Sequence, residues 1–266
     1  MIGSAKAEIR KQWDVDPCGA STAPGELPGT REFYKQVRQH RYGVYAPWLS
    51  PLIESEKIPR RCVLEIGVGL GSDHFRFASA GNSMVALDLS LEHLRQTRRH
   101  LELERLCTRP VYGDAEQTGF AGESFDLVYS FGVIHHTPNP GSAVKEIHRI
   151  LKPGGVAIVS VYHRYSLNLF WFVARNGLLR GGLFRRRWSQ FLSEIEYRKE
   201  PNSAVPMVRL FSRREARQLF ACFKNVQVST HHVEFPPLHR KWPTTRTSLE
   251  RLGRVFGWYV FIKAEK

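Results

Sequence analysis

Short apolar runs alternate with amphipathic stretches between residues 61 and 162, and this rhythm constrains the fold more than any other feature of the chain. The runs have the length of single strands: Cys62–Gly67, Met84–Leu89, Pro110–Tyr112, Phe125–Ser130 and Val156–Val161. The stretches between them predict helices at Ser72–Ala80, Ser90–Leu106 and Ser142–Leu151. Strands that alternate with helices form a parallel sheet with right-handed crossovers, so the sequence predicts an α/β fold.

The alternation breaks after Tyr162, where a long basic and aromatic segment begins. A capping box at Ser212–Glu215 predicts a helix to about Phe223, and residues 248–256 have helical spacing. Val226–Ser229 and Trp258–Lys263 predict the last two strands, which close the sheet as a hairpin.

We therefore predict one α/β domain at residues 57–266, decorated by insertions at 163–211 and 236–257. Residues 1–56 are predicted to form an N-terminal arm and helical lid: residues 14–30 are rich in Pro and Gly, and 31–56 have helical spacing. The lid would include Gln12, Trp13 and Asp16–Gly19.

Cysteine usage and apolar patches indicate the compartment. Four cysteines, without a CxxC pair, argue against a zinc site and a disulfide framework, so we expect no metal and a reducing cytoplasm. Residues 1–13 lack the apolar stretch of a signal peptide. The longest apolar patch, Leu167–Ala174, is too short to span a bilayer.

Positive charge is concentrated in the last two-fifths of the chain. Residues 161–266 carry 20 Lys and Arg against 7 Asp and Glu, whereas residues 1–160 carry 19 against 18. Such a surface fits an acidic substrate, an anionic membrane or nucleic acid, or serves solubility alone. The insertion at 163–211 mixes bulky apolar and Arg residues, a composition that suits an acceptor pocket, core packing or peripheral contact with a membrane.

Alternate glycines follow the first predicted strand. Gly67, Gly69 and Gly71 let the backbone turn sharply and approach a ligand that a Cβ would exclude. A dinucleotide loop needs a further glycine where this chain has Ser72. Glu65 would repel a pyrophosphate but suits a ligand with an ammonium and a sulfonium, so the loop favours a cationic nucleoside cofactor.

Two more carboxylates follow predicted strands. Asp88, with Leu89, ends the second strand and can accept both hydroxyls of a ribose. Asp114 and Ala115 end the third, where the carboxylate can accept from an adenine amine and a backbone N–H can meet a ring nitrogen. Together they predict a nucleoside site at one edge of the sheet.

The motif series resembles the class I S-adenosylmethionine-dependent methyltransferases of the type 11 group, which includes ubiquinone/menaquinone C-methyltransferases and natural-product enzymes. The stretches that carry the resemblance are VLEIGVGLG, VALDLS, GDAEQTGF, SFDLVYSFGVIHHTPNP and EIHRILKPGGVAIVSVY, over residues 60–162. The resemblance implies a Rossmann-like, mostly parallel seven-stranded sheet with helices on both faces and an antiparallel last strand.

The same resemblance implies S-adenosylmethionine as cofactor and assigns its contacts. The methionine and nucleoside portion would lie against Glu65, Gly67, Gly69 and Gly71, the ribose against Asp88, and the adenine against Asp114 and Ala115. Ser130 and Phe131 would contact the methionine end. Arg41 or Tyr42, ahead of the sheet, can bind the cofactor carboxylate.

A histidine pair follows the fourth strand, where the acceptor approaches the methyl group. His135 and His136 can act as general base near neutral pH, or one can anchor the loop through backbone hydrogen bonds. His163 is a second candidate.

The sequence thus predicts a methyltransferase for a small-molecule acceptor of lipidic or aromatic type. Alternatives are an RNA-modifying methyltransferase that uses the basic C-terminal part, and a non-catalytic cofactor-binding partner protein. Base N-methylation is disfavoured because residues 131–135 lack an Asp/Asn-Pro-Pro-aromatic segment. Ser72 and Glu65 disfavour a nicotinamide oxidoreductase.

Overall fold

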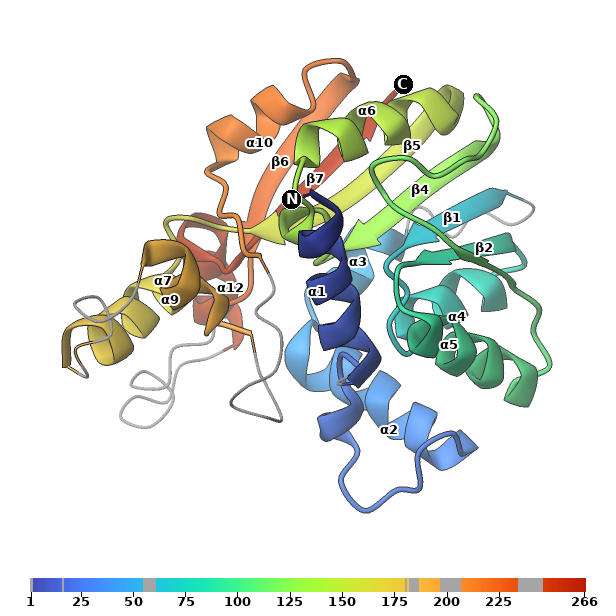
Figure 1. Ribbon diagram of the computed structural model, residues 1–266, viewed down its shortest axis with the longest axis horizontal. Helices are drawn as coiled ribbons and strands as arrows, with labels where there is room; N and C mark the ends of the chain where they lie inside the picture. The colour runs from blue at the N-terminus through green and yellow to red at the C-terminus, as the bar shows by residue number, and fades with distance from the viewer. Residues whose placement is uncertain are drawn as a thin grey trace.

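A computed structural model describes residues 2–15, 17–54, 61–179, 181, 187–196, 207–233 and 246–266. Its centre is a seven-stranded sheet in the order β3-β2-β1-β4-β5-β7-β6 (Figure 1). The strands are β1 Cys62–Ile66, β2 Ser83–Asp88, β3 Arg109–Tyr112, β4 Phe125–Phe131, β5 Leu151–Tyr162, β6 Lys224–His231 and β7 Tyr259–Glu265. Strands β1 to β5 pair in parallel, and β7 is antiparallel to both β5 and β6. The predicted fold class, including the antiparallel last strand, is confirmed.

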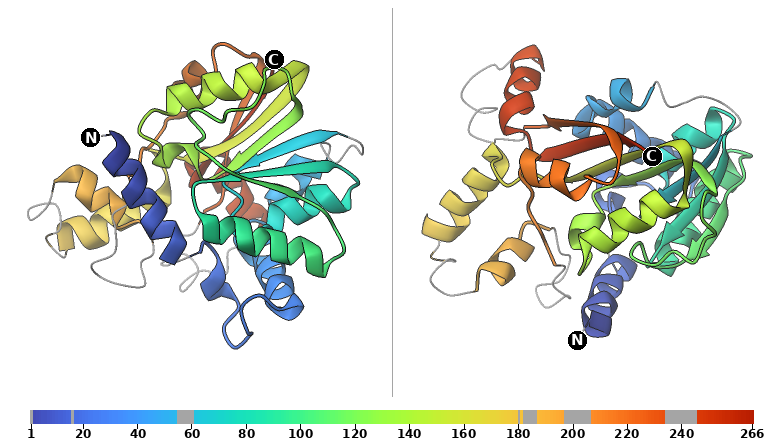
Figure 2. Two further views of the ribbon diagram at one scale, coloured as in Figure 1. Left: turned by 45° about the vertical axis from the view of Figure 1, so that its right-hand side comes forward. Right: turned by 90° about the horizontal axis from the view of Figure 1, so that it is seen from above.

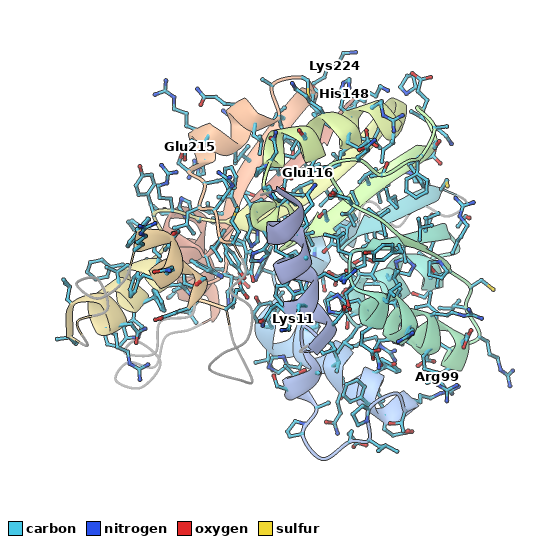
Figure 3. The ribbon with its side chains drawn as sticks, in the orientation of Figure 1. Lys11, Arg99, Glu116, His148, Glu215 and Lys224 are labelled. Atoms are coloured by element: carbon cyan, nitrogen blue, oxygen red, sulfur yellow. The ribbon has the colours of Figure 1, made fainter. Side chains whose placement is uncertain are left out.

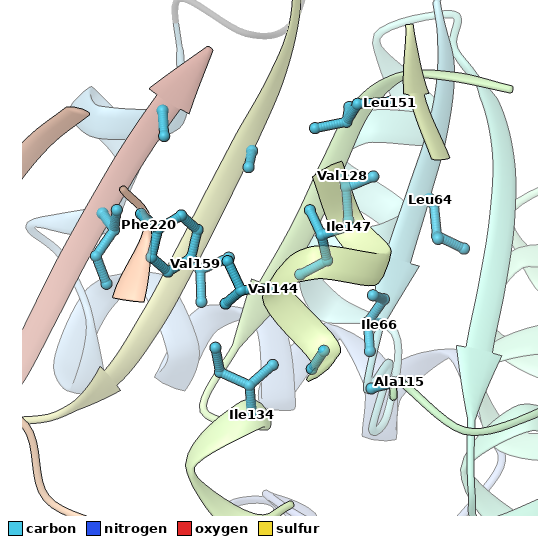
Figure 4. Packing of buried hydrophobic residues seen from close by; sticks show 14 of the residues in the cluster. Leu64, Ile66, Ala115, Val128, Ile134, Val144, Ile147, Leu151, Val159 and Phe220 are labelled. Carbon is cyan, nitrogen blue, oxygen red and sulfur yellow. The ribbon is translucent and has the colours of Figure 1, made fainter. Parts of the chain in front are cut away.

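Helices cover both faces of the sheet because successive strand residues point to opposite sides. Leu64 and Ile66 belong to the cluster drawn in Figure 4, to which α6 (Pro140–Ile150) and α10 (Arg213–Leu219) also contribute. Val63 faces the opposite cluster, to which α3 (Leu49–Glu54), α4 (Ser72–Ser79) and α5 (Leu91–Leu103) contribute. Both faces are therefore apolar, as expected of a sheet enclosed by crossover helices.

Local capping rules set the helix starts. Ser90 accepts from the backbone N–H of His93 and begins α5, as predicted. Ser212 and Glu215 form the predicted capping box of α10. Asn139 caps α6 through the N–H of Ser142, so this helix begins at Pro140, two residues before the predicted start.

The N-terminal segment is more helical than the sequence indicated. It contains α1 (Ile2–Val15), the short η1 (Ala20–Thr22), α2 (Arg31–His40) and η2 (Arg41–Tyr45). Helix α1 was not predicted. It lies across the carboxyl ends of the strands, where Lys6 pairs with Asp114 and where the hydroxyl of Ser90 donates to Asp14 (Figure 2).

The predicted insertions carry four helices: α7 (Leu167–Phe172), η4 (Val173–Leu179), α9 (Trp188–Ser193) and α12 (Arg246–Phe256). The first three lie away from the sheet (Figure 2), whereas α12 packs against β6, where the Thr230 hydroxyl donates to the carbonyl of Arg254. Pro236, Pro237, Pro243 and the predicted lid residue Asp16 lie outside the described residues. The boundary predicted at residue 57 also lies there and stays a prediction. Across the described residues, the helices are all too short or too polar to cross a membrane.

Candidate functional site

A cavity of about 380 Å³ opens at the carboxyl ends of the parallel strands, the edge where α/β sheets bind ligands. The loops after β1, β2 and β4, together with α1 and η2, form its walls. Most of the predicted site residues line it: Glu65, Gly67, Gly69, Asp88, Leu89, Asp114, Ala115, Phe131 and His136. The topology therefore brings residues from distant parts of the chain into one site.

The glycine loop has a left-handed backbone, with φ of +77° at Gly67, +53° at Gly69 and +74° at Gly71. A Cβ on Gly67 would lie 2.1 Å from Cγ2 of Val133, so packing requires this glycine. A Cβ on Gly69 would meet its nearest atom, the carbonyl oxygen of Cys18, only at 4.0 Å. Gly69 thus leaves open space beside the cavity, a cradle into which a ligand can approach the backbone.

Asp88 holds two loops at the nucleoside end. Its Oδ2 accepts from the N–H of Val68 (2.9 Å) and its Oδ1 from the N–H of Ser90 (2.8 Å), while Nδ1 of His93 lies 3.1 Å from Oδ2. A carboxylate has about four acceptor positions, so one remains for a hydroxyl on the cavity side. This geometry leaves a position for one ribose hydroxyl, whereas the sequence predicted that Asp88 accepts both.

The predicted adenine contact is engaged by α1. Lys6 pairs with Asp114 and, at 2.8 Å, with Glu116, which lies beside α1 in Figure 3. The backbone N–H of Glu116 also donates to Asp114 (2.9 Å). An adenine amine would therefore share this carboxylate with a lysine, which the sequence did not indicate.

Charged side chains gather at the opposite side of the glycine loop. Arg41 forms a two-point ion pair with Asp73 (2.6 and 3.2 Å), and its guanidinium lies 4.0 Å from the ring centre of Phe131. Asp73 also accepts from the hydroxyls of Tyr42 and Tyr129. Of the two candidates for the cofactor carboxylate, Arg41 lines the cavity, whereas Tyr42 only supports Asp73.

Two buried carboxyl groups here differ in protonation. Burial and the neighbouring Asp73 raise the pKa of Glu65 well above its usual range. Burial also raises the pKa of Asp73, but Arg41 and the hydrogen bonds reverse this and hold it below the ordinary value. His74, which contacts Glu65 at 2.9 Å, has a pKa lowered to about 3 by burial and is neutral. A ligand ammonium would therefore favour ionised Glu65, as the predicted role requires.

Aromatic side chains and two polar groups form the far end of the cavity. Tyr45, Phe131, Tyr162 and Tyr259 line it, and Trp13 lies edge-on to His136 at 5.7 Å between ring centres. Glu196, from the insertion, accepts from the Tyr162 hydroxyl (2.6 Å) and lies 3.5 Å from Nε2 of His136. Nδ1 of His136 is 2.7 Å from the carbonyl oxygen of Met207.

Three predicted site residues do not line the cavity: Gly71, Ser130 and His135. Ser130 and His135 are fully buried behind its wall, and a Cβ on Gly71 would press on Thr97 at 3.0 Å. His135 therefore has no direct contact with the cavity, and its role as general base stays a prediction. His163 is also buried, with Nδ1 held by the carbonyl of Gly257 (2.9 Å).

Sequence reasoning missed several lining residues. Lys6 and Ile9, with the predicted Trp13, recur at helical spacing, so this face of α1 could have been recognised. Asp73 occupies the first turn of the helix after the glycine loop, which was a further signal. No local signal marks Glu196, which only tertiary folding brings to the cavity.

Comparisons with known proteins agree with the motif series. Residues 64–159 match the family model of a methyltransferase domain. Over 128 residues the chain is 34% identical to the demethylmenaquinone methyltransferase of Renibacterium salmoninarum, covering 46% of this chain and 50% of that protein. Over 150 residues it is 33% identical to the ubiquinone/menaquinone biosynthesis C-methyltransferase of a Ruegeria species, covering 51% and 57%.

A structural likeness extends further along the chain. The crystal structure of an S-adenosylmethionine-dependent methyltransferase from Thermotoga maritima aligns with a TM-score of 0.54 at 24% identity, covering 88% of this chain and 98% of that one. At this identity the likeness concerns the fold alone. The chain spans about half the length of the curated relatives it matches.

Proposed function

Because the chain carries a class I S-adenosylmethionine-dependent methyltransferase domain of the type 11 group, we propose that it methylates a small aromatic acceptor bearing an ionisable hydroxyl. The observation that carries the proposal is the continuity of one cavity. It joins the nucleoside carboxylates, Asp88 and Asp114, to an aromatic end with Tyr162 and Glu196.

The residues present fit the cofactor. The backbone at Gly69 leaves room for close approach, Asp88 retains an acceptor position, and Arg41 offers a guanidinium beside Glu65. S-adenosylmethionine supplies an electrophilic methyl group on a sulfonium. Positioning can then provide most of the rate enhancement, because the reaction is an in-line displacement.

The acceptor end supplies orientation and proton handling. Phe131, Tyr45 and Tyr259 can stack against an aromatic ring. His136, with Glu196 behind its Nε2, lies on the cavity and can take part in removing the hydroxyl proton. Curated relatives named for menaquinone and ubiquinone biosynthesis make hydroxylated quinone precursors the first acceptors to test.

The test is transfer of a radiolabelled methyl group from S-adenosylmethionine to a panel of phenols, quinols, amines and RNA. We expect label in the organic phase with phenols or quinols, and its loss in Asp88→Asn. Label only in RNA would instead favour the alternative that uses the basic C-terminal part. Cofactor binding without transfer to any member would favour the non-catalytic partner protein.

One surface supports the predicted peripheral contact with an anionic membrane. The insertion exposes large apolar side chains on its short helices and on the turn before α7: Tyr165, Phe170, Leu178, Leu179 and Trp188. Apolar groups exposed in a strongly basic segment suit the interface of an anionic bilayer. This contact would bring a lipidic acceptor to the cavity.

A further inference from the structure

Two histidines and one carboxylate converge behind the acceptor end of the cavity. One ligand atom each of His135, His136 and Glu196 lies within 4.8 Å of the others. Both histidines are buried, and Glu196 is largely so. They come from the loop after β4 and from the insertion, so the arrangement exists only in the folded chain.

Hydrogen bonds orient two of these groups toward a common point. A carbonyl oxygen only accepts, so the contact with Met207 (2.7 Å) places the proton of His136 on Nδ1. The lone pair of Nε2 then faces Oε1 of Glu196 at 3.5 Å, an arrangement that needs a cation or a shared proton between them. The Tyr162 hydroxyl donates to the same oxygen (2.6 Å). Metal-binding histidines and carboxylates are oriented by such outer contacts.

His135 supplies an independent observation. Within the described part of the chain neither ring nitrogen has a hydrogen-bond partner, although the side chain is fully buried. A buried polar group without a partner costs about 1–3 kcal/mol. Coordination of a metal ion would remove this cost.

We propose that His135, His136 and Glu196 bind a divalent transition-metal ion, with zinc the best match to two imidazoles and one carboxylate. In a tetrahedral zinc site the ligand atoms lie about 3.3–3.6 Å apart, so the three side chains draw together by about 1 Å. Because His136, Glu196 and Tyr162 line the cavity, a fourth ligand would reach the ion from the cavity side. The absence of paired cysteines, which argued against zinc, has no bearing on this ligand set.

The role of the ion rests on the proposed function. An acceptor hydroxyl bound at the fourth position would lose its proton to solvent more readily, because the ion stabilises the oxyanion. That oxygen then forms the bond to the methyl carbon, while the electron pair of the broken C–S bond stays on sulfur. A metal site thus explains how a buried histidine pair serves deprotonation of the acceptor hydroxyl.

Titration of the chelator-treated full chain with Co²⁺, followed by visible absorption and reversed by Zn²⁺, tests the proposal. We expect one equivalent bound, with affinity lowered more than about tenfold in His135→Ala and in the near-isosteric Glu196→Gln. His148→Ala, on the outer helix α6 (Figure 3), should bind as the wild type does. Thermal unfolding of each variant establishes that it is folded.

Failure of the folded wild type to bind one equivalent, or equal binding by Glu196→Gln, would overturn the metal site. Calorimetry with S-adenosylhomocysteine on the same samples separates the two proposals. Cofactor binding without Co²⁺ binding rejects only the metal, whereas Co²⁺ binding without cofactor binding rejects the proposed function.

Discussion

Replacement of Asp88 by asparagine separates the structural use of this carboxylate from its use in binding. Both oxygens accept backbone N–H groups, from Val68 and Ser90, so the amide introduced by Asp88→Asn would turn its NH₂ toward one of them. One buried N–H then loses its partner, and the ribose loses its charged acceptor. Each loss is worth about 1–3 kcal/mol. The lost N–H partner lowers the free energy of unfolding by this amount, and the lost ribose acceptor weakens cofactor binding by roughly 5- to 150-fold.

Asp126→Asn is the matched control. Asp126 also accepts a backbone N–H, from Cys62 (2.8 Å), and pairs with Lys152, but it lies at the amino end of β4. Both variants should unfold at lower temperature, and only Asp88→Asn should bind S-adenosylhomocysteine more weakly by calorimetry. If Asp88→Asn binds within about twofold of the wild type, the ribose assignment is refuted.

Four further variants probe the site and the insertion. Because the pKa of Glu65 is raised, binding of a ligand ammonium should release a proton from this side chain. The affinity for S-adenosylhomocysteine should therefore rise with pH until the pKa of Glu65 is passed. Calorimetry in two buffers should show proton release on binding, and Glu65→Gln should abolish it. Gly67→Ala should lower the melting temperature, because the added Cβ would clash with Val133. Gly69→Ala should change the free energy of unfolding by only about 1–2 kcal/mol but weaken cofactor binding. If Gly69→Ala unfolds more readily than Gly67→Ala and binds the cofactor as the wild type does, the cradle at Gly69 is contradicted. Flotation with anionic liposomes at low salt should fall when Phe170 and Leu179 are both changed to Glu, and equal flotation would reject the membrane contact.

Local rules explain how much of the fold was predictable. Strands β1, β2, β4, β5 and β7 are largely buried apolar runs. Ser90 and Ser212 mark the starts of the helices that they cap. The carboxyl ends of parallel strands must meet at one edge, so the loop at Gly67 and the acid at Asp88 could be placed in one site from the sequence alone.

The rest depended on tertiary contacts that no local pattern encodes. Lys6 reaches Asp114 across 108 residues, and Glu196 reaches Tyr162 from an irregular insertion. His135 and His136 are adjacent in sequence and chemically identical. Only the path of the loop after β4 turns one toward the cavity and the other into the core.

The central claim is that the cavity binds a sulfonium nucleoside rather than a diphosphate. Calorimetric titration of the full chain with S-adenosylhomocysteine and with NAD, at equal concentrations, tests it directly. We predict one-to-one binding of S-adenosylhomocysteine and no heat from NAD, because Ser72 lines the cavity where a dinucleotide loop needs a further glycine. Binding of NAD in its place, or of neither ligand, would contradict the account.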